Sequence, residues 1–557
     1  MIEFQEDEQR LKLAELRQKQ EEEFIKMAAG KRGFSYINLA SAPIEADALR
    51  LLPEAEARAS QTVVFQIVEK KLGIGAVMPD SAETKKIVEA FKGQGYGIAV
   101  FMISPPSFER AAAKYKEISF AKETKIGSFE ISSEDISSML AEIKNVLGVK
   151  ELVSKALGER KSSRVTKIVE IILAGALAIG ASDVHLEPEE TSVTLRYRLD
   201  GVLNKVLSID QTTYEYILSR IKVLSRLKLN VKTQAQDGRF SIKAKDQEIE
   251  VRTSIIPGAY NESIVLRILN PDSISVSLEE LGIEPNLYKI LEKEIDRPNG
   301  LILTTGPTGS GKTTTLYAFL KKVHVPGVKI ITIEDPIEYH LPGIVQTQTD
   351  AEKGYTFLSG LRAVLRQDPD IIMVGEIRDS ETAEIAVNAS LTGHLVFSTL
   401  HTNDAAGTFP RLLDLDVNPK VLVSAVAIAM AQRLVRKLCA NCKKEVALAG
   451  NDRKVADEVL EHIPVEEYKK LQREKVYEPV GCEKCNNTGY KGRIGIFEAI
   501  LSTKAIETAV LQNPSEREIR IAAKEQGLLT MQEDGIVKIL QGATSFVELR
   551  RVIDITE

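Results

Sequence analysis

Short apolar runs separated by helix-forming stretches dominate the chain between residues 300 and 430. The runs are 300–305, 330–333, 370–374 and 395–399. Continuous apolar runs of this length are typical of strands buried on both faces of a parallel sheet, whereas half-exposed strands alternate. A helix-forming stretch follows the first run. The pattern predicts an α/β domain with a parallel core, which we place at residues 300–557 with a helical C-terminus at 496–557.

The preceding region contains a larger share of alternating segments. An apolar helix ending at Gly180 comes first, and an Asp200-Gly201 pair between two strand-like segments predicts a hairpin. The predicted strands are 193–198, 201–207, 240–243, 248–254 and 263–269, with one helix at 214–227. We therefore expect a second, α+β domain at residues 165–275 and a linker at 276–299.

The N-terminal part has three segments of different character. Residues 1–33 are rich in Glu, Gln, Lys and Arg, which predicts an exposed helical leader, either simply solvated or used to dock a partner. Residues 34–125 contain short strand and helix patterns of a small α/β domain without a catalytic constellation. Residues 126–164 are interpreted as a linker between the two N-terminal domains.

Composition restricts the class of protein. The 557 residues are 43% hydrophobic and 27% charged, with a formal net charge of −6. These are ordinary globular values, and they give no overall attraction to nucleic acid or acidic lipid. No run approaches about 18 uninterrupted apolar residues, and the acidic start does not resemble a signal peptide. We therefore expect several domains, no transmembrane segment and a cytoplasmic location.

The turn after the first apolar run has the spacing G-x-x-x-x-G-K-T of a phosphate loop. The expected nucleotide-binding residues are Gly306, Pro307, Thr308, Gly309, Ser310, Gly311, Lys312, Thr313 and Thr314. The glycines let backbone N–H groups face a phosphate, Lys312 can reach the β and γ oxygens, and the Thr313 hydroxyl suits Mg²⁺. A Gly-rich turn before an ordinary helix could match by chance, but the flanking strand and helix favour a site for ATP and Mg²⁺.

Two of the apolar runs end in a carboxylate. Glu334 follows 330–333, and Glu376 follows 370–374 after one glycine. Carboxyl ends of parallel strands meet at the edge where such sheets bind ligands. His394 and His401 flank the run 395–399; a lone His is more often structural, but this pair is predicted to sense phosphate or to partner the carboxylates.

The four cysteines form two C-x-x-C knuckles. They are Cys439, Cys442, Cys482 and Cys485. Two knuckles can close a tetrahedral zinc site, whereas a single one could be a redox motif. Four thiolate ligands leave no open position, so we predict a structural zinc ion in a module at about 435–495.

The second domain is rich in arginine. Its arginines include Arg196, Arg198, Arg220, Arg226, Arg239, Arg252 and Arg267. A nucleic-acid surface would use arginines in this way, and so would a surface facing a triphosphate. Because no aromatic residues are interleaved with them and a phosphate loop follows in the sequence, we favour the triphosphate and expect no nucleic acid.

Four motifs in order give the chain a family resemblance. They are 306–315 as Walker A, 332–339 (TIEDPIEY) as an aspartate box, 370–379 (DIIMVGEIRD) as the Walker B region and 391–404 (LTGHLVFSTLHTND) as a histidine box. Residues 165–557 thereby resemble the assembly ATPases of type IV pili and type II secretion, in the secretion-ATPase superfamily. The tetracysteine element is similar to that of the assembly-type enzymes. Residues 34–125 resemble the family's first N-terminal domain only loosely and lack the repeated motif that binds cyclic di-GMP in some relatives.

The resemblance implies an architecture and a function. It implies a RecA-like P-loop ATPase core with a preceding PAS-like α+β domain, a small N-terminal α/β domain and a tetracysteine zinc module. It further implies a homo-hexamer peripheral to the inner membrane, acting through an inner-membrane platform protein, with cytoplasmic pilus accessory proteins as possible further partners. Two alternatives stay open, a nucleic-acid translocase or helicase and a nucleotide-regulated scaffold. Stimulation by nucleic acid would favour the former, and binding without hydrolysis the latter.

The resemblance also implies roles for single residues. Arg252 and Arg267, 15 positions apart on successive strand-like segments, match a pair of arginine fingers, although ordinary salt bridges would use the same residues. Glu334 is expected to orient or deprotonate the attacking water, and Glu376 to hold the water shell of the metal. Lys312 and His401 complete the expected catalytic set, with Thr313 on the metal.

Overall fold

The computed structural model describes residues 22–39, 42, 44–45, 48–49, 51–68, 71–93, 95–116, 128–129, 139, 142–158, 161–244, 247–270 and 276–555. The chain forms two compact units, residues 1–122 with 158–167, and residues 123–157 with 168–557. Most of the predicted leader, 1–21, lies outside the described residues, and residues 22–32 are helical as predicted. In the described part of the chain, every helix is too short or too polar to cross a lipid bilayer.

The first unit is a small α/β domain, as its sequence predicted. Its sheet has the order β1-β4-β3-β2, with β2 and β3 antiparallel and the other pairs parallel. Phe65, Ile74 and Phe108 lie in its core. The elements are β1 (Ser35–Tyr36), α3 (Glu54–Ser60), β2 (Thr62–Val68), β3 (Lys71–Ala76), α4 (Ala82–Gly93), β4 (Gly97–Met102), α5 (Pro105–Ala113) and η1 (Lys114–Lys116).

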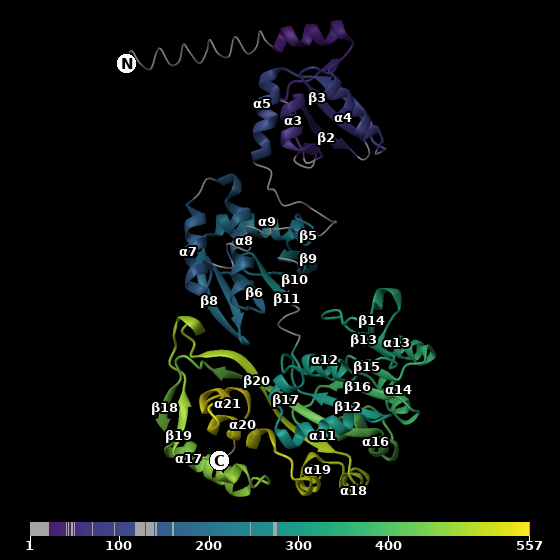
Figure 1. Cartoon of the computed structure of the whole chain (residues 1–557), viewed down its shortest axis with the longest axis vertical. Helices are drawn as coiled ribbons and strands as arrows, with labels where there is room; N and C mark the ends of the chain where they lie inside the picture. Colours follow the sequence, from purple (N-terminus) through teal and green to yellow (C-terminus); the bar gives the residue numbers. More distant parts are fainter. Residues whose placement is uncertain are drawn as a thin grey trace. The chain divides into compact units, whose positions relative to one another are not determined.

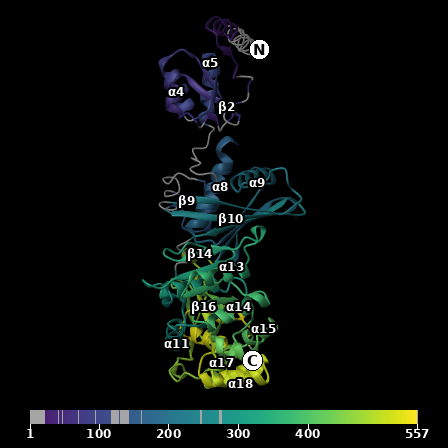
Figure 2. The same cartoon turned by 90° about the vertical axis from the view of Figure 1, so that its right-hand side faces the viewer.

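The second domain of the chain, in the second unit, is a seven-stranded sheet with helices α8 and α9 against one face (Figures 1 and 2). The strand order is β5-β9-β10-β11-β6-β7-β8, antiparallel except for β5 with β9. Its elements are β5 (Ser128–Phe129), α7 (Val146–Leu157), α8 (Lys161–Ala178), β6 (Asp183–Pro188), β7 (Val193–Leu199), β8 (Val202–Ile209), α9 (Gln211–Leu224), β9 (Gln236–Ala244), β10 (Gln247–Pro257) and β11 (Glu262–Leu269). The hairpin forms where predicted, because Asp200 and Gly201 both adopt the positive φ (47° and 85°) that a tight two-residue turn requires. The finer PAS-like assignment stays a prediction.

The C-terminal domain is built on a second seven-stranded sheet. Its order is β14-β13-β15-β16-β12-β17-β20; β17 and β20 are antiparallel and the other pairs parallel. Alternate residues of β12 face opposite layers: Ile302 packs with α11 and α12, whereas Leu301 and Leu303 pack with α13, α14 and α16. The elements are α11 (Pro285–Ile295), β12 (Gly300–Thr305), α12 (Lys312–Val323), β13 (Ile330–Glu334), β14 (Val345–Gln348), η3 (Ala351–Lys353), α13 (Phe357–Val364), η4 (Leu365–Gln367), β15 (Ile371–Val374), α14 (Ser380–Leu391), β16 (Leu395–Leu400), α15 (Thr408–Asp414), α16 (Pro419–Ala425) and β17 (Val426–Leu438).

The helical C-terminus predicted at 496–557 is partly wrong. The domain continues through β18 (Lys444–Ala447), α17 (Gly450–His462), η5 (Tyr468–Lys470), β19 (Lys475–Glu478), η6 (Glu483–Cys485), β20 (Tyr490–Leu501), α18 (Lys504–Gln512), α19 (Glu516–Ala523), η7 (Lys524–Gln526), α20 (Met531–Leu540) and α21 (Phe546–Val552). Residues 490–501 form a strand because they pair along β17 and bury Ile496, Phe497 and Ile500. Helices begin only at Lys504.

Two predicted linkers contain packed helices. In the stretch 126–164, α7 buries Val149 and Val153, and the methyl groups of Val149 face Gly175 of α8. In the stretch 276–299, α11 buries Leu287 and Leu291 in the core of the C-terminal domain. These two helices therefore belong to the domains that follow them, because their apolar faces are buried there.

Candidate functional site

The phosphate loop connects β12 to α12 and packs closely against β17. Gly306, Gly309 and Gly311 have positive φ values of 145°, 80° and 93°. A Cβ atom at Gly306 would lie 2.6 Å from the Gln432 carbonyl oxygen, and one at Gly311 would lie 2.7 Å from Gln432 Nε2. Glycine is therefore required at both positions by conformation and by space.

The phosphate loop gathers several hydrogen-bond donors at the start of α12. Helix α12 begins after Gly311 without a side-chain cap, so its first amide groups are available to an anion. Among the described residues, the buried hydroxyl of Ser310 has no hydrogen-bond partner. Lys312 Nζ donates to the carbonyl oxygens of Gly306 (2.6 Å) and Pro307 (3.3 Å). Burial lowers the pKa of Lys312, and nearby Glu376 opposes that effect. These donors fit nucleotide phosphates.

Two residues of β17 complete the loop, and our sequence analysis missed both. Gln432 accepts a 2.7 Å hydrogen bond from the Thr315 hydroxyl, and Arg433 donates to the Asn403 carbonyl oxygen at 2.8 Å. Arg433 thereby connects the phosphate loop to the segment after β16. The sequence analysis did not predict that β17 pairs in parallel with β12. This pairing brings residues 432 and 433 beside the loop.

Glu334 lies at the carboxyl end of β13 with its side chain on the α12 side of the sheet. It is only 3% exposed. Three neutral groups donate to it: the Thr332 hydroxyl (2.5 Å), the Gln346 amide (3.0 Å) and the Tyr317 phenol. Burial raises the pKa of Glu334 above its usual value, although these hydrogen bonds act in the opposite direction.

Glu376 lies just after β15, two strands from the phosphate loop. His401 Nε2 is 3.2 Å from one of its carboxylate oxygens, and Arg378 forms an ion pair with the other. The structure thus brings together His401 and Glu376, as predicted. His394 is different, because it precedes β16 and lies at the opposite edge of the sheet, where its Nδ1 is 3.1 Å from the Ala389 carbonyl oxygen. The predicted site role of His394 is therefore wrong.

Comparison with known proteins identifies the family. Residues 158–551 match the family of type II/IV secretion system proteins. The chain belongs to this family. The predicted membership of the secretion-ATPase superfamily is confirmed, and with it the predicted activity, that of an ATPase.

Relatives of this family cover nearly the whole chain. It is 37% identical to the type II secretion system protein E of Dickeya dadantii, over 92% of this chain and 98% of that protein. It is 39% identical to the type IV pilus assembly ATPase TfpB of Acinetobacter baylyi, over 82% and 76% respectively. The solved structure of the ATPase DotB of Legionella pneumophila superposes with a TM-score of 0.50 at 20% identity, covering 69% of this chain and 94% of that one, and shows likeness of fold.

In this secretion ATPase, the arginines of the second domain form a row. Arg239, Arg252 and Arg267 are direct partners across β9, β10 and β11. Arg252 donates to Glu338 Oε2 (3.1 Å) and to the Ile337 carbonyl oxygen (2.8 Å), and Arg267 donates to Asp183 (3.1 Å). The row lines a cavity of about 1040 Å³ together with residues 336–339 of the aspartate box and the adjacent His340. Carboxylates of Asp237, Glu248, Glu250 and Glu338 also line the cavity, so its surface has mixed charge and Arg252 forms salt bridges within it.

The four cysteines form one cluster. Their sulfur atoms all lie within 4.8 Å of one another, and neighbouring pairs are separated by 3.8–3.9 Å. A zinc ion with four Zn–S bonds of about 2.3 Å has sulfur–sulfur edges of about 3.8 Å. The spacing fits a tetrahedral ion and is too long for disulfides, which measure about 2.05 Å.

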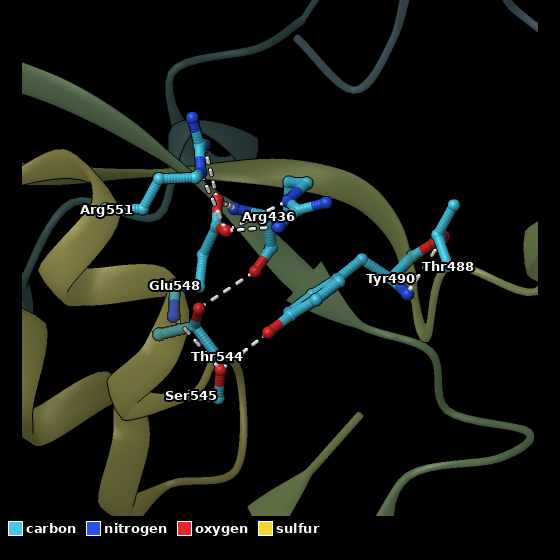
Figure 3. Close-up of polar contacts among 7 residues, drawn as sticks. All are labelled: Arg436, Thr488, Tyr490, Thr544, Ser545, Glu548 and Arg551. Carbon is cyan, nitrogen blue, oxygen red and sulfur yellow. Dashed lines mark hydrogen bonds and ion pairs between the residues drawn. The ribbon is translucent and has the colours of Figure 1, made fainter. Parts of the chain in front are cut away.

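A polar network connects this cluster to helix α21. The Thr488 hydroxyl donates to the Cys485 carbonyl oxygen (2.7 Å). Figure 3 shows the rest of the network, in which Tyr490 shares a 2.7 Å hydrogen bond with Ser545 at the start of α21. The Arg436 guanidinium lies 4.1 Å from the centre of the Tyr490 ring and donates to Glu548 at 2.6 Å. Arg551 donates to the other Glu548 oxygen at 2.6 Å.

Proposed function

We propose that this chain is a motor that hydrolyses ATP to drive assembly of a type IV pilus or a type II secretion pseudopilus. It acts as a homo-hexamer at the cytoplasmic face of the inner membrane, through a membrane platform protein. Support comes from the names of its relatives, which include both type II secretion and type IV pilus assembly proteins. We further propose that the second domain is PAS-like, as the resemblance implies; its mostly antiparallel sheet with helices against one face supports this.

One observation carries the hydrolytic part of the proposal. The phosphate loop, Glu334 and Glu376 all lie at the carboxyl ends of parallel strands of one sheet. Lys312 and the first amides of α12 bind phosphate oxygens, and Thr313 and Glu376 hold Mg²⁺ or its water shell. His401 fixes the orientation of Glu376. Glu334 orients and deprotonates the attacking water, because its neutral donors leave its carboxylate without a competing cation.

Arg252 and Arg267 serve as arginine fingers in this proposal. Their side chains lie on one face of adjacent strands, where a planar guanidinium can grip phosphate oxygens in two places. The present partners, Glu338 and Asp183, would then hold the two side chains between turnovers. Each arginine-to-alanine variant is expected to keep ATP binding and to lose turnover on the order of 10³-fold. Mixing Arg252→Ala chains with Glu334→Gln chains restores hydrolysis if a site is shared between subunits.

The experiment that tests the proposal is steady-state phosphate release by the full chain. Lys312→Ala weakens both binding and turnover, whereas Glu334→Gln binds ATP and stops turnover. Glu352→Gln, at an exposed carboxylate outside the site, is the matched control and keeps the parent rate. Parent-like hydrolysis by Glu334→Gln overturns the general-base assignment. Failure of the gene to restore pili or secretion in a deletion strain overturns the motor assignment.

A further inference from the structure

Tyr317 contacts the proposed base from the helix that the phosphate loop starts. It lies on α12 five residues after Lys312, is 0% exposed, and its phenol donates to Glu334 Oε2. The other two donors, Thr332 and Gln346, both bond Oε1. Tyr317 is therefore the group that fixes the second oxygen, and two anchored oxygens define the plane of the carboxylate.

The phenol is held in place by its surroundings. The rings of Tyr317 and Tyr339 pack edge to face with centroids 4.5 Å apart and an interplanar angle of 63°. Tyr339 closes the aspartate box, and its carbonyl oxygen accepts from the Gln346 amide at 3.1 Å. Gln346 is thus tied to the aspartate box, whereas Tyr317 is carried by α12, so a shift of α12 relative to that box would move the donor on Oε2.

The charges around Glu334 are few. The titratable groups that face it are Tyr317 from α12, and Glu338 and Tyr339 from the segment after β13. Among the described residues, no Lys or Arg forms an ion pair with Glu334. Burial and the Glu334 carboxylate raise the pKa of the Tyr317 phenol far above neutrality, so it keeps its proton and donates it to Glu334. The groups that oppose the effect of burial on the Glu334 pKa are therefore neutral hydrogen-bond donors.

We propose that Tyr317 is a positioning residue for ATP hydrolysis, whose hydrogen bond sets the orientation and proton affinity of Glu334. The inference rests on the proposed role of Glu334 as the base. Glu334 acts on the attacking water, and Tyr317 acts on Glu334. Because α12 starts at the phosphate loop, a movement of α12 on phosphate binding would change this hydrogen bond and with it the orientation of Glu334.

The test is the pH dependence of kcat for the full chain with Tyr317→Phe. This change keeps the ring and removes one donor, so the carboxylate ionises at higher pH. The acid limb of the kcat profile is expected to move upward by about one pH unit, a tenfold loss on that limb, with KM for ATP within about twofold of the parent. Thr332→Val removes a donor from Oε1 and shifts the limb in the same direction, which keeps the inference testable if Tyr317→Phe folds poorly.

Tyr355→Phe is the matched control. Its phenol donates at 3.0 Å to the Thr347 hydroxyl on the neighbouring strand β14 and does not contact Glu334, so its profile should superimpose on that of the parent. An unshifted Tyr317→Phe profile, or equal shifts in both tyrosine variants, overturns the inference while leaving the base assignment intact if Glu334→Gln is inactive. A fully active Glu334→Gln instead removes the proposed function on which the inference rests.

Discussion

Two buried glutamates of the same domain, Glu334 and Glu548, are held in opposite ways. Glu334 receives hydrogen bonds from neutral groups, and burial raises its pKa. Glu548, which is 0% exposed, receives two arginines and the backbone amide of Arg436, and the pKa of Glu548 falls despite its burial. The two sites differ in the charge of their side-chain donors, which are neutral at Glu334 and cationic at Glu548. The carboxylate that we propose as the base has neutral donors, whereas the one that joins elements is neutralised by cations.

The largest expected effect comes from removing the ion that we propose for the cysteine cluster. Cys485 connects through Thr488 and Tyr490 to the start of α21, where Glu548 lies. Because a structural site adds its binding free energy to folding, chelation or Cys482→Ser should lower the thermal midpoint of the full chain by about 10 °C or more. The chemistry at Glu334 should survive in the chains that remain folded.

Elemental analysis and thermal unfolding with and without chelator provide the measurement. Cys439→Ser, at the other knuckle, should match Cys482→Ser, because both sulfurs belong to the same cluster. Protein purified under reducing conditions with less than one zinc ion per chain, or an unchanged midpoint after chelation, contradicts this prediction.

The next largest effect separates the two glutamates directly. Glu548→Gln leaves two arginines without their buried counter-charge, which should destabilise the protein by about 3 kcal/mol. Glu334→Gln removes a carboxylate whose ionisation is disfavoured by burial, so its stability should equal or exceed that of the parent. Denaturant midpoints at pH 7 measure both. Equal losses in the two variants would remove the distinction between the sites.

The pH dependence of stability should differ in sign between the two residues. The folded-state pKa of Glu548 is lowered, so its contribution is present above the unfolded value of about 4.3 and is lost as pH falls through the folded value. The folded-state pKa of Glu334 is raised, so its ionisation reduces stability as pH rises from about 4.3 through the folded value. Each variant should approach the parent at acid pH and diverge from it, in opposite directions, toward neutrality. Urea unfolding midpoints of the parent and both variants, measured from acid to neutral pH, test this prediction.

The sequence was most informative where local pattern and chemistry agree. The runs 300–305 and 330–333 form β12 and β13, because a continuous apolar run is favoured in a sheet covered on both faces. Glu334 and Glu376 could be found from their place after such runs. The antiparallel pairing of β17 with β20 was not predicted. Residues 428–438 and 490–501 form strands because they hydrogen-bond to each other, and the two segments are far apart in the sequence.

The surroundings of the site residues were harder to predict. Tyr317 is one of several apolar positions on α12, and the local hydrophobic pattern predicts only that its side chain is buried in the core. Gln346 lies on an edge strand without marked periodicity. Arg436 and Glu548 are separated by 112 positions, so their pairing depends on the tertiary fold. Residues that act through others could be recognised only when the hydrogen bonds were known.

The smallest effect concerns Tyr490, which contacts the Glu548 network through two features of one side chain. Its phenol shares a 2.7 Å hydrogen bond with Ser545, and its ring lies under the Arg436 guanidinium. Tyr490→Phe keeps the ring and removes the hydroxyl, so it should cost about 1 kcal/mol. Tyr490→Leu also removes the cation–π contact and should cost about 1 kcal/mol more.

These two variants also test how Tyr490 affects the pH dependence of stability that arises from Glu548. If Arg436 is oriented toward Glu548 by the ring, Tyr490→Leu should weaken the pH dependence that Glu548 gives to stability, whereas Tyr490→Phe should leave it unchanged. Urea midpoints at acid and neutral pH distinguish the two. An equal loss of pH dependence in both variants would show that the hydroxyl, through Ser545 and the start of α21, holds Glu548 between its arginines. The neutral hydrogen bond would then act at Glu548 as we propose that Tyr317 acts at Glu334.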